Sequence, residues 1–213
     1  MNNVWFVTGT DTDVGKTVAT AWLACQWMKQ GYRTITQKLV QTGSEHGSPD
    51  IEAHRRLMQM RFAEDDEGLT APEVFSYPCS PHMASDLQNR PIDFQRILGA
   101  TQTLSERYDR VIVEGAGGIM VPLTRELLTI DFIARQGWPV VFVTNGKLGS
   151  INHTLLSLEV MKNRGMTLTH LIFNDWHPMP DEKIDENTYE FFRYWLNRFW
   201  PKAEMLRCPK LSL

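Results

Sequence analysis

The sequence predicts an α/β fold with a mostly parallel central sheet and helices on both of its faces. Short apolar runs alternate along the chain with longer segments of helical periodicity, which is the pattern of βαβ units. The connections between the apolar runs are mostly long enough to hold crossover helices, so parallel pairing is favoured over hairpins. The length fits one domain, and no linker, repeat or low-complexity tract interrupts it. We therefore expect a single domain over residues 1–213.

The first predicted elements surround a glycine-containing loop. A buried strand is predicted over 4–7 and a helix over 16–30, with Gly31 placed to end that helix. A second strand is predicted over 33–38 and a second helix over 50–60. The stretch 68–91 is rich in proline and polar residues, and we expect a long loop there.

The second half of the chain continues the alternation. Helices are predicted over 93–107 and 151–163, and strands over 110–114, 139–144 and 168–173. The segment 189–200 is crowded with aromatic residues. It predicts a helix packed on the core, with a subunit contact as the alternative because the aromatics occupy more than one face.

Composition excludes several classes of protein. The formal net charge of −3 gives no support to a nucleic-acid partner or an anionic membrane partner. Cys25, Cys79 and Cys208 are far apart, so we expect neither a disulfide framework nor a zinc site. No apolar stretch approaches the ~20 residues of a membrane helix, and the first residues lack the pattern of a secretory signal. A cytoplasmic location is expected.

The segment 9–17, GTDTDVGKT, lies between a predicted strand and a predicted helix, as a phosphate-binding P-loop does. Its backbone N–H groups and the helix N-terminus would face the phosphates of a nucleotide. Lys16 would reach the β- and γ-phosphates, and the Thr17 hydroxyl would bind Mg²⁺. Five residues separate Gly9 from Gly15 where four are usual, so Thr10 takes the place of the first glycine. The loop indicates that the fold is that of a P-loop NTPase.

Two acidic residues inside this loop, Asp11 and Asp13, are unexpected beside an anionic ligand. They would repel phosphate unless they turn away or engage a cation, a substrate ammonium group or backbone N–H groups of the loop. Binding of an amine-bearing substrate and capping of the loop both remain open.

Three further polar residues are candidates for the same site: Lys38 and Glu114 end predicted strands, and Asp50 opens a predicted helix. Glu114, which opens the run EGAGG, stands where a Mg²⁺ anchor lies in many P-loop NTPases; the alternative is a surface glutamate before a glycine turn. Asp50 is a candidate third oxygen ligand or a helix cap. Lys38 would point into the same crevice, although a lone lysine is more often solvated.

Together these residues resemble the dethiobiotin synthetase family. The resemblance is carried by VTGTDTDVGKT at 7–17, the lysine-to-glycine run 38–43, Asp50, SPH at 80–82, VEGAGG at 113–118, KLGSINH at 147–153 and Asn174-Asp175. These matches cover nearly the whole chain in the family's order.

The resemblance implies an ATP-dependent ligase of biotin biosynthesis that acts as a homodimer. The family converts 7,8-diaminononanoate, CO₂ and ATP into dethiobiotin, ADP and phosphate. A substrate amine captures CO₂ as a carbamate, which attacks the γ-phosphorus, and the second amine then closes the ring. The negative charge that accumulates calls for fixed cations, with Mg²⁺ as the metal.

The resemblance also assigns roles to residues. It implies catalytic roles for Lys16, Lys38 and Thr12, and Mg²⁺ binding by Thr17, Asp50 and Glu114. It implies ATP contacts for Asp13, Val14, Gly15, Lys16, Thr17, Val18, Asp50, Glu114, Gly115, Ala116, Gly117, Asn174, Asp175, Pro209, Lys210 and Leu211. It implies substrate contacts for Thr42 and Gly118, and for Leu148, Gly149, Ser150, Ile151 and Asn152 of the neighbouring subunit.

The chain departs from the family at three places. Leu39 replaces the usual proline, and Thr42 stands where serine is common and keeps the hydroxyl. The chain also stops soon after 208–211, where relatives usually continue, and we expect this to affect nucleotide affinity or base specificity.

Other P-loop proteins fit less well. A partitioning or nitrogenase-type ATPase would carry an extra lysine early in the loop, and a GTPase would show Asn-Lys-x-Asp where residues 144–147 are TNGK. A cobyrinate-type ligase would normally need a glutaminase domain as well. A ligase for another diamine and a non-catalytic or switch-type P-loop protein stay as alternatives.

Overall fold

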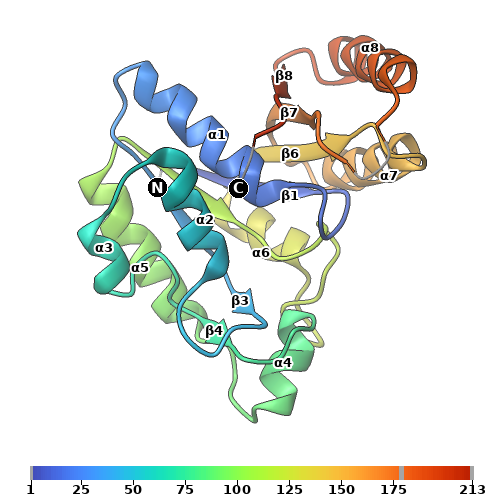
Figure 1. Ribbon diagram of the computed structural model, residues 1–213. Coiled ribbons are helices and arrows are strands. Elements are labelled where there is room, and N and C mark those ends of the chain that lie inside the picture. Colours follow the sequence, from blue (N-terminus) through green and yellow to red (C-terminus); the bar gives the residue numbers. More distant parts are fainter. Residues whose placement is uncertain (1, 178–179, 212–213) are drawn as a thin grey trace.

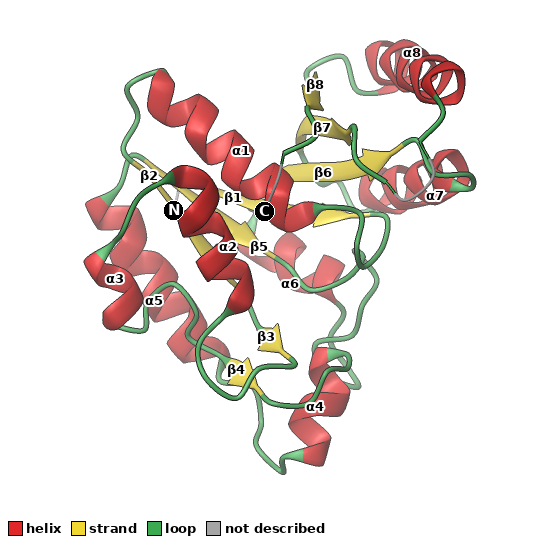
Figure 2. Ribbon diagram, viewed as in Figure 1, coloured by secondary structure: helices red, strands yellow, loops and turns green. Residues whose placement is uncertain are grey.

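A six-stranded sheet forms the centre of the computed structural model, which describes residues 2–177 and 180–211 (Figures 1 and 2). The strand order is β2-β5-β1-β6-β7-β8, and each neighbouring pair is parallel. The strands are β1 (Val4–Gly9), β2 (Thr34–Lys38), β5 (Arg110–Glu114), β6 (Val140–Asn145), β7 (Leu168–Asn174) and β8 (Glu204–Cys208). Two short strands, β3 (Gln41–Thr42) and β4 (Val74–Phe75), pair in parallel beside it. The predicted α/β class is confirmed.

Helices cover both faces of the sheet (Figure 2). One face carries α1 (Lys16–Lys29) and α2 (Pro49–Met58), which lie in front of the sheet in Figure 1. The other carries α5 (Phe94–Arg107), α6 (Thr129–Gln136), α7 (Ser150–Asn163) and α8 (Glu182–Phe199). Two shorter helices, α3 (Ala63–Asp66) and α4 (Pro81–Leu87), interrupt the connections.

Two separate hydrophobic cores lie on the two faces of the sheet. Successive residues of a strand pack into different cores, because side chains alternate across a sheet. In β1, Val4 and Phe6 are buried with residues of α5 to α8, whereas Val7 is buried with residues of α1. Parallel strands covered on both faces are apolar throughout, which is why their sequences are continuous apolar runs. The carboxyl ends of all six strands meet at one edge of this sheet.

The predicted strands and helices are present, with ends shifted by one to a few residues. The prediction of one long loop over 68–91 was wrong, because β4 and α4 lie within it. A two-residue strand and a seven-residue helix are too short to show a period in sequence. The helices α3 and α6 and the strands β3 and β8 were also not predicted from the sequence.

The aromatic segment forms most of α8 and packs on the core, as predicted. Phe192 and Leu196 are buried, and Phe192 contacts Phe173 of β7, whereas Tyr194 is exposed. All three cysteines are free thiols. In the part of the chain that the structure describes, no helix combines the length and apolar character needed to cross a bilayer.

Candidate active site at the carboxyl edge of the sheet

A cavity of about 930 Å³ lies at the carboxyl edge of the sheet. It is lined by the P-loop, the ends of β2 and β5, the start of α2, residues 78–81 and the last described residues. Ligands of open α/β sheets bind at this edge. The predicted site residues in its wall are Thr12, Asp13, Gly15, Lys16, Thr17, Val18, Lys38, Thr42, Asp50, Glu114, Ala116, Gly117, Asn174, Lys210 and Leu211.

The P-loop turns into α1 at Gly15, whose φ of 93° lies in the left-handed region that glycine adopts without strain. Lys16 follows as the first residue of α1 and donates from Nζ to the carbonyl oxygen of Asp11 at 2.7 Å. Burial lowers the pKa of Lys16 to about 8. Asp11 accepts a hydrogen bond from the backbone N–H of Thr12 at 2.7 Å.

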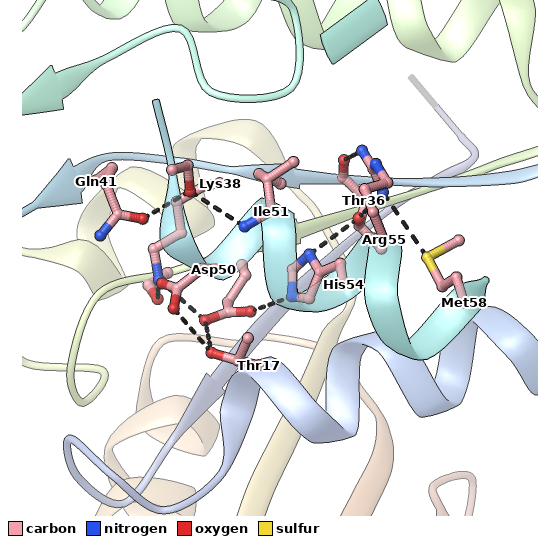
Figure 3. Close-up of polar contacts among 12 residues, drawn as sticks. Thr17, Thr36, Lys38, Gln41, Asp50, Ile51, His54, Arg55 and Met58 are labelled. Carbon is pink, nitrogen blue, oxygen red and sulfur yellow. Dashed lines mark hydrogen bonds and ion pairs between the residues drawn. The ribbon is translucent and has the colours of Figure 1, made fainter. Parts of the chain in front are cut away.

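Lys38 and Glu114 form the buried centre of the site. The two residues are partners in the register of β2 and β5, so both side chains leave the sheet at the same level. Lys38 Nζ lies 2.9 Å from Glu114 Oε1 and 2.5 Å from Asp50 Oδ2, and it also donates to the Gly115 carbonyl oxygen at 3.1 Å. Figure 3 shows Lys38 reaching toward Asp50 at the start of α2.

Burial and pairing act in opposite directions on these two charges. Burial disfavours the ammonium, but the carboxylates of Glu114 and Asp50 outweigh it and raise the pKa of Lys38. Burial also disfavours the Glu114 carboxylate, but Lys38 and His54 hold the pKa of Glu114 well below its usual range. Lys38 is therefore a fixed cation and Glu114 a fixed anion at neutral pH.

Thr17 and Asp50 bring two more oxygen-bearing side chains to this pair. The Thr17 hydroxyl lies 3.0 Å from Glu114 Oε1 and 3.2 Å from Asp50 Oδ1 (Figure 3). Asp50 is not the cap of α2, because Ser48 accepts from the Ile51 N–H in that role. Over the described ranges, no group of three His, Cys, Asp or Glu side chains forms a metal-binding cluster. Two carboxylates with a hydroxyl still suit Mg²⁺, which usually takes one or two carboxylates and completes its shell with phosphates and water.

Asn174 closes the far side of the P-loop. Its Nδ2 donates to the carbonyl oxygens of Val14 and Trp176, at 3.0 and 3.3 Å, and its Oδ1 accepts from the Trp176 N–H at 3.3 Å. Both amide protons are thus engaged with backbone.

Other predicted site residues lie outside the cavity wall. Asp175 forms an ion pair with Arg207 at 2.7 Å, and Val14 is buried in the core under α1. Gly115 and Pro209 adjoin the wall, and Gly118 packs near the Thr10 carbonyl oxygen. The segment 148–152 follows β6 away from the cavity, and Leu148 is 95% exposed.

Comparison with known proteins identifies the family. A family model described as an AAA domain matches residues 3–194. The ATP-dependent dethiobiotin synthetase BioD 2 of Pasteurella multocida is 45% identical over 204 residues, which is 95% of each chain. The protein of the same name from Haemophilus ducreyi is 44% identical over 97% of this chain and 98% of its own. The chain belongs to the ATP-dependent dethiobiotin synthetase family. The predicted resemblance is confirmed.

A further relative and two solved structures are also similar to this chain. The ATP-dependent dethiobiotin synthetase BioD of Chlorobaculum tepidum is 45% identical over 91% of this chain and 81% of its own. Among solved structures, pNOB8 ParA bound to nonspecific DNA has a TM-score of 0.54 at 14% identity, covering 97% of this chain and 80% of that one. The chimerical protein CapA2B2 has a TM-score of 0.51 at 19% identity, covering 85% and 78%. These two solved structures share the fold of this chain.

Sequence reasoning missed several residues at the site. His54 of α2 contacts Glu114 directly, and Trp176, Cys79 and Gln41 line the cavity. Asp50 and His54 are four residues apart and so share one face of a helix, which was the available signal for His54. Nothing in the spacing indicated the other three.

Proposed function

We propose that this chain makes dethiobiotin from 7,8-diaminononanoate, CO₂ and ATP, releasing ADP and phosphate. The observation that carries the proposal is the buried ammonium of Lys38, which Glu114 and Asp50 hold opposite the P-loop. It supplies positive charge at the place where carbamate and γ-phosphate oxygens would meet. The relatives' name, ATP-dependent dethiobiotin synthetase, supports the same reaction.

The reaction has three steps. One substrate amine adds to CO₂, forming an N–C bond and losing a proton to give a carbamate. A carbamate oxygen attacks the γ-phosphorus, breaking its bond to the β-γ bridging oxygen and releasing ADP. The second amine attacks the carbonyl carbon, loses a proton, and expels phosphate as the five-membered ureido ring closes.

Two lysines would stabilise the charge that develops. In the cavity wall, Lys16 lies on the phosphate side and would contact the β- and γ-phosphate oxygens. Lys38 would contact the carbamate and the transferred phosphoryl group, since it is held rigidly and stays protonated. The hydroxyls of Thr12 and Thr42 would hydrogen-bond the carbamate or the substrate amines.

Thr17, Asp50 and Glu114 would hold Mg²⁺. The support is the convergence of one hydroxyl and two carboxylates beside the P-loop. A carboxylate oxygen of Asp50 and one of Glu114 each lie within 3.2 Å of the Thr17 hydroxyl. When bound, Mg²⁺ neutralises charge on the β- and γ-phosphates. The protein's own part is to fix the oxygens before the nucleotide arrives.

We also propose how the rest of the molecule serves this site. Asn174, Lys210 and Leu211 would surround the base. The segment 148–152 would reach the substrate carboxylate of a second copy in a homodimer, and the 95% exposure of Leu148 in one chain supports that role. We further propose a single domain over residues 1–213, a cytoplasmic location, and no nucleic-acid partner.

The test is phosphate release from ATP with Mg²⁺, bicarbonate and 7,8-diaminononanoate, with dethiobiotin followed by mass spectrometry. We expect one phosphate per dethiobiotin and no release above background without the diamine. Equal release without the diamine, or none with it, would reject the proposal. A higher rate with a different vicinal diamine would favour the alternative of a related ligase.

The role of Lys38 is tested by Lys38→Ala, with Lys29→Ala as the matched control at the exposed last residue of α1. We expect Lys38→Ala to bind ATP and to lose ring formation, provided circular dichroism shows that it is folded. Lys29→Ala should behave as the unaltered chain. Unchanged turnover in folded Lys38→Ala would remove Lys38 from the mechanism.

A further inference from the structure

The side chain of His54 is completely buried between α2 and the carboxylate of Glu114. It is 0% exposed, and Glu114 is 1% exposed. His54 Nε2 lies 2.8 Å from Glu114 Oε2, and His54 Nδ1 lies 3.0 Å from Thr36 Oγ1 (Figure 3). The ring therefore bridges strand β2 and the anionic centre of the site.

The spacing of helix and strand explains how this contact is made. Asp50 and His54 are four residues apart on α2, which is about 6 Å of helix rise. Their partners Lys38 and Thr36 are two residues apart on β2, which is about 6.6 Å of strand and the same face. The spacing of the two side chains on α2 therefore matches the spacing of their partners on β2, and the two contacts together fix the position of α2 along β2.

The hydrogen-bond partners assign the protons on the ring. An ionised carboxylate only accepts, so Nε2 must carry the proton that bonds to Glu114 Oε2. On the other side, Arg55 donates to Thr36 Oγ1 at 2.8 Å and is itself held by Asp65 at 2.8 Å (Figure 3 shows Arg55 beside Thr36). The Thr36 oxygen thus accepts from Arg55, and its own proton is directed at Nδ1.

The two carboxylate oxygens of Glu114 have different partners. Oε2 is bound by His54, whereas Oε1 lies 2.9 Å from Lys38 Nζ and 3.0 Å from Thr17 Oγ1. Rotation of the carboxylate would break the bond to His54, so one oxygen stays turned to the cavity. Partners of this kind, outside the metal's own ligands, fix a ligand's orientation.

We propose that His54 is a positioning residue that holds Glu114 Oε1 toward the cation and phosphate side of the cavity. The proposal rests on the function proposed above, since it assumes that Glu114 is a Mg²⁺ ligand. His54 itself touches neither nucleotide nor substrate. Thr36, Arg55 and Asp65 act behind it by keeping the ring's protonated nitrogen toward Glu114.

The first measurement needs neither metal nor substrate. Imidazole ¹⁵N spectra of the metal-free protein, with His54 assigned through His54→Gln, report which ring nitrogen carries the proton. We expect the proton on Nε2 with Nδ1 acting as acceptor. A neutral ring protonated at Nδ1 would overturn the proposal.

The second measurement is Mn²⁺ binding in the presence of ADP, followed by electron paramagnetic resonance. His54→Gln places an amide N–H near the position of Nε2 and should bind Mn²⁺ much as the unaltered chain does. His54→Leu removes the donor, and His54→Asn is too short to reach Glu114. Both should weaken Mn²⁺ binding by about 10- to 100-fold.

The matched control is His170→Leu, which alters another mostly buried histidine on β7 that contacts no site residue. It should leave Mn²⁺ binding unchanged even where the melting temperature falls. Equal Mn²⁺ affinity in His54→Leu and His54→Gln would overturn the positioning role. Neither measurement uses diamine or CO₂, so failure of the unaltered chain to make dethiobiotin is a separate result.

Discussion

Replacing Lys38 with methionine removes one buried charge and keeps most of the side chain's length. Glu114 then stays in the same place, 1% exposed, with hydrogen bonds from His54 and Thr17 and no neighbouring ammonium from β2. Removing one partner of a buried ion pair costs about 3 to 5 kcal/mol, because the other charge is left uncompensated. For a chain of this size that lowers the melting temperature by about 6 to 20 °C.

The sign of the pH dependence should reverse in the same variant. In the unaltered chain the pKa of Glu114 is lowered from 4.5, so its contribution to stability is present above that pH and is lost as the pH falls. Burial is the largest single influence on Glu114, so without Lys38 we expect the pKa of Glu114 to rise. The variant should then lose stability as the pH rises above about 4.5, the ordinary glutamate value.

The assay is urea unfolding of each variant between pH 4 and pH 8, monitored by fluorescence. The double variant Lys38→Met with Glu114→Gln should recover much of the loss, because the buried charge is gone. Arg33→Met is the control, since the ion pair of Arg33 with Asp109 is exposed and should contribute little. Additive losses in the double variant, or a stability profile with the same sign as the unaltered chain, would refute the reasoning.

Three further predictions concern other parts of the site and fold. Because the pKa of Lys16 is about 8 and phosphate needs the charged form, ATP affinity measured by calorimetry should be about tenfold weaker at pH 9 than at pH 7; a flat profile would contradict this. Gly15→Ala forces a residue with a Cβ to a φ of 93°, at a cost of about 1 to 2 kcal/mol, and should weaken ATP binding in the same titration; unchanged stability and affinity would argue against it. Gly146→Ala places a Cβ against the carboxylate of Asp185 and should destabilise the fold by about 1 to 3 kcal/mol in thermal unfolding, whereas Gly99→Ala, with open space inside α5, should not destabilise it.

The sequence predicted those elements whose cause is local. The apolar runs of β1, β5 and β6 are long enough to be recognised, and the P-loop has its own residue pattern. In contrast, α4 has seven residues and β4 has two, so neither shows a period, and β8 gains its strand character from pairing with β7. Such elements exist because of tertiary contacts.

The site also contains residues that the sequence could place and residues that it could not. Lys38 and Glu114 could be placed together because each ends a predicted parallel strand, and such ends share an edge. The spacing from Asp50 places His54 on the same helix face, but its contact with Glu114 could not be predicted, because a buried histidine in sequence looks like any other core residue. Its meaning depends on the packing of α2 against β2, which brings Thr36 and Glu114 to opposite sides of one ring.

The strand order has a consequence for the time at which the site is completed. β1 and β2 follow one another in the chain, yet β5 lies between them in the sheet, and Glu114 is 76 residues later than Lys38. During synthesis the P-loop and Lys38 leave the ribosome well before the strand that separates them. A nascent chain therefore carries Lys38 and Asp50 before Glu114, the buried partner of Lys38, has been made. Pairing between strands far apart in sequence is generally slow, so we expect nucleotide to meet a complete site only after β5 has joined the sheet.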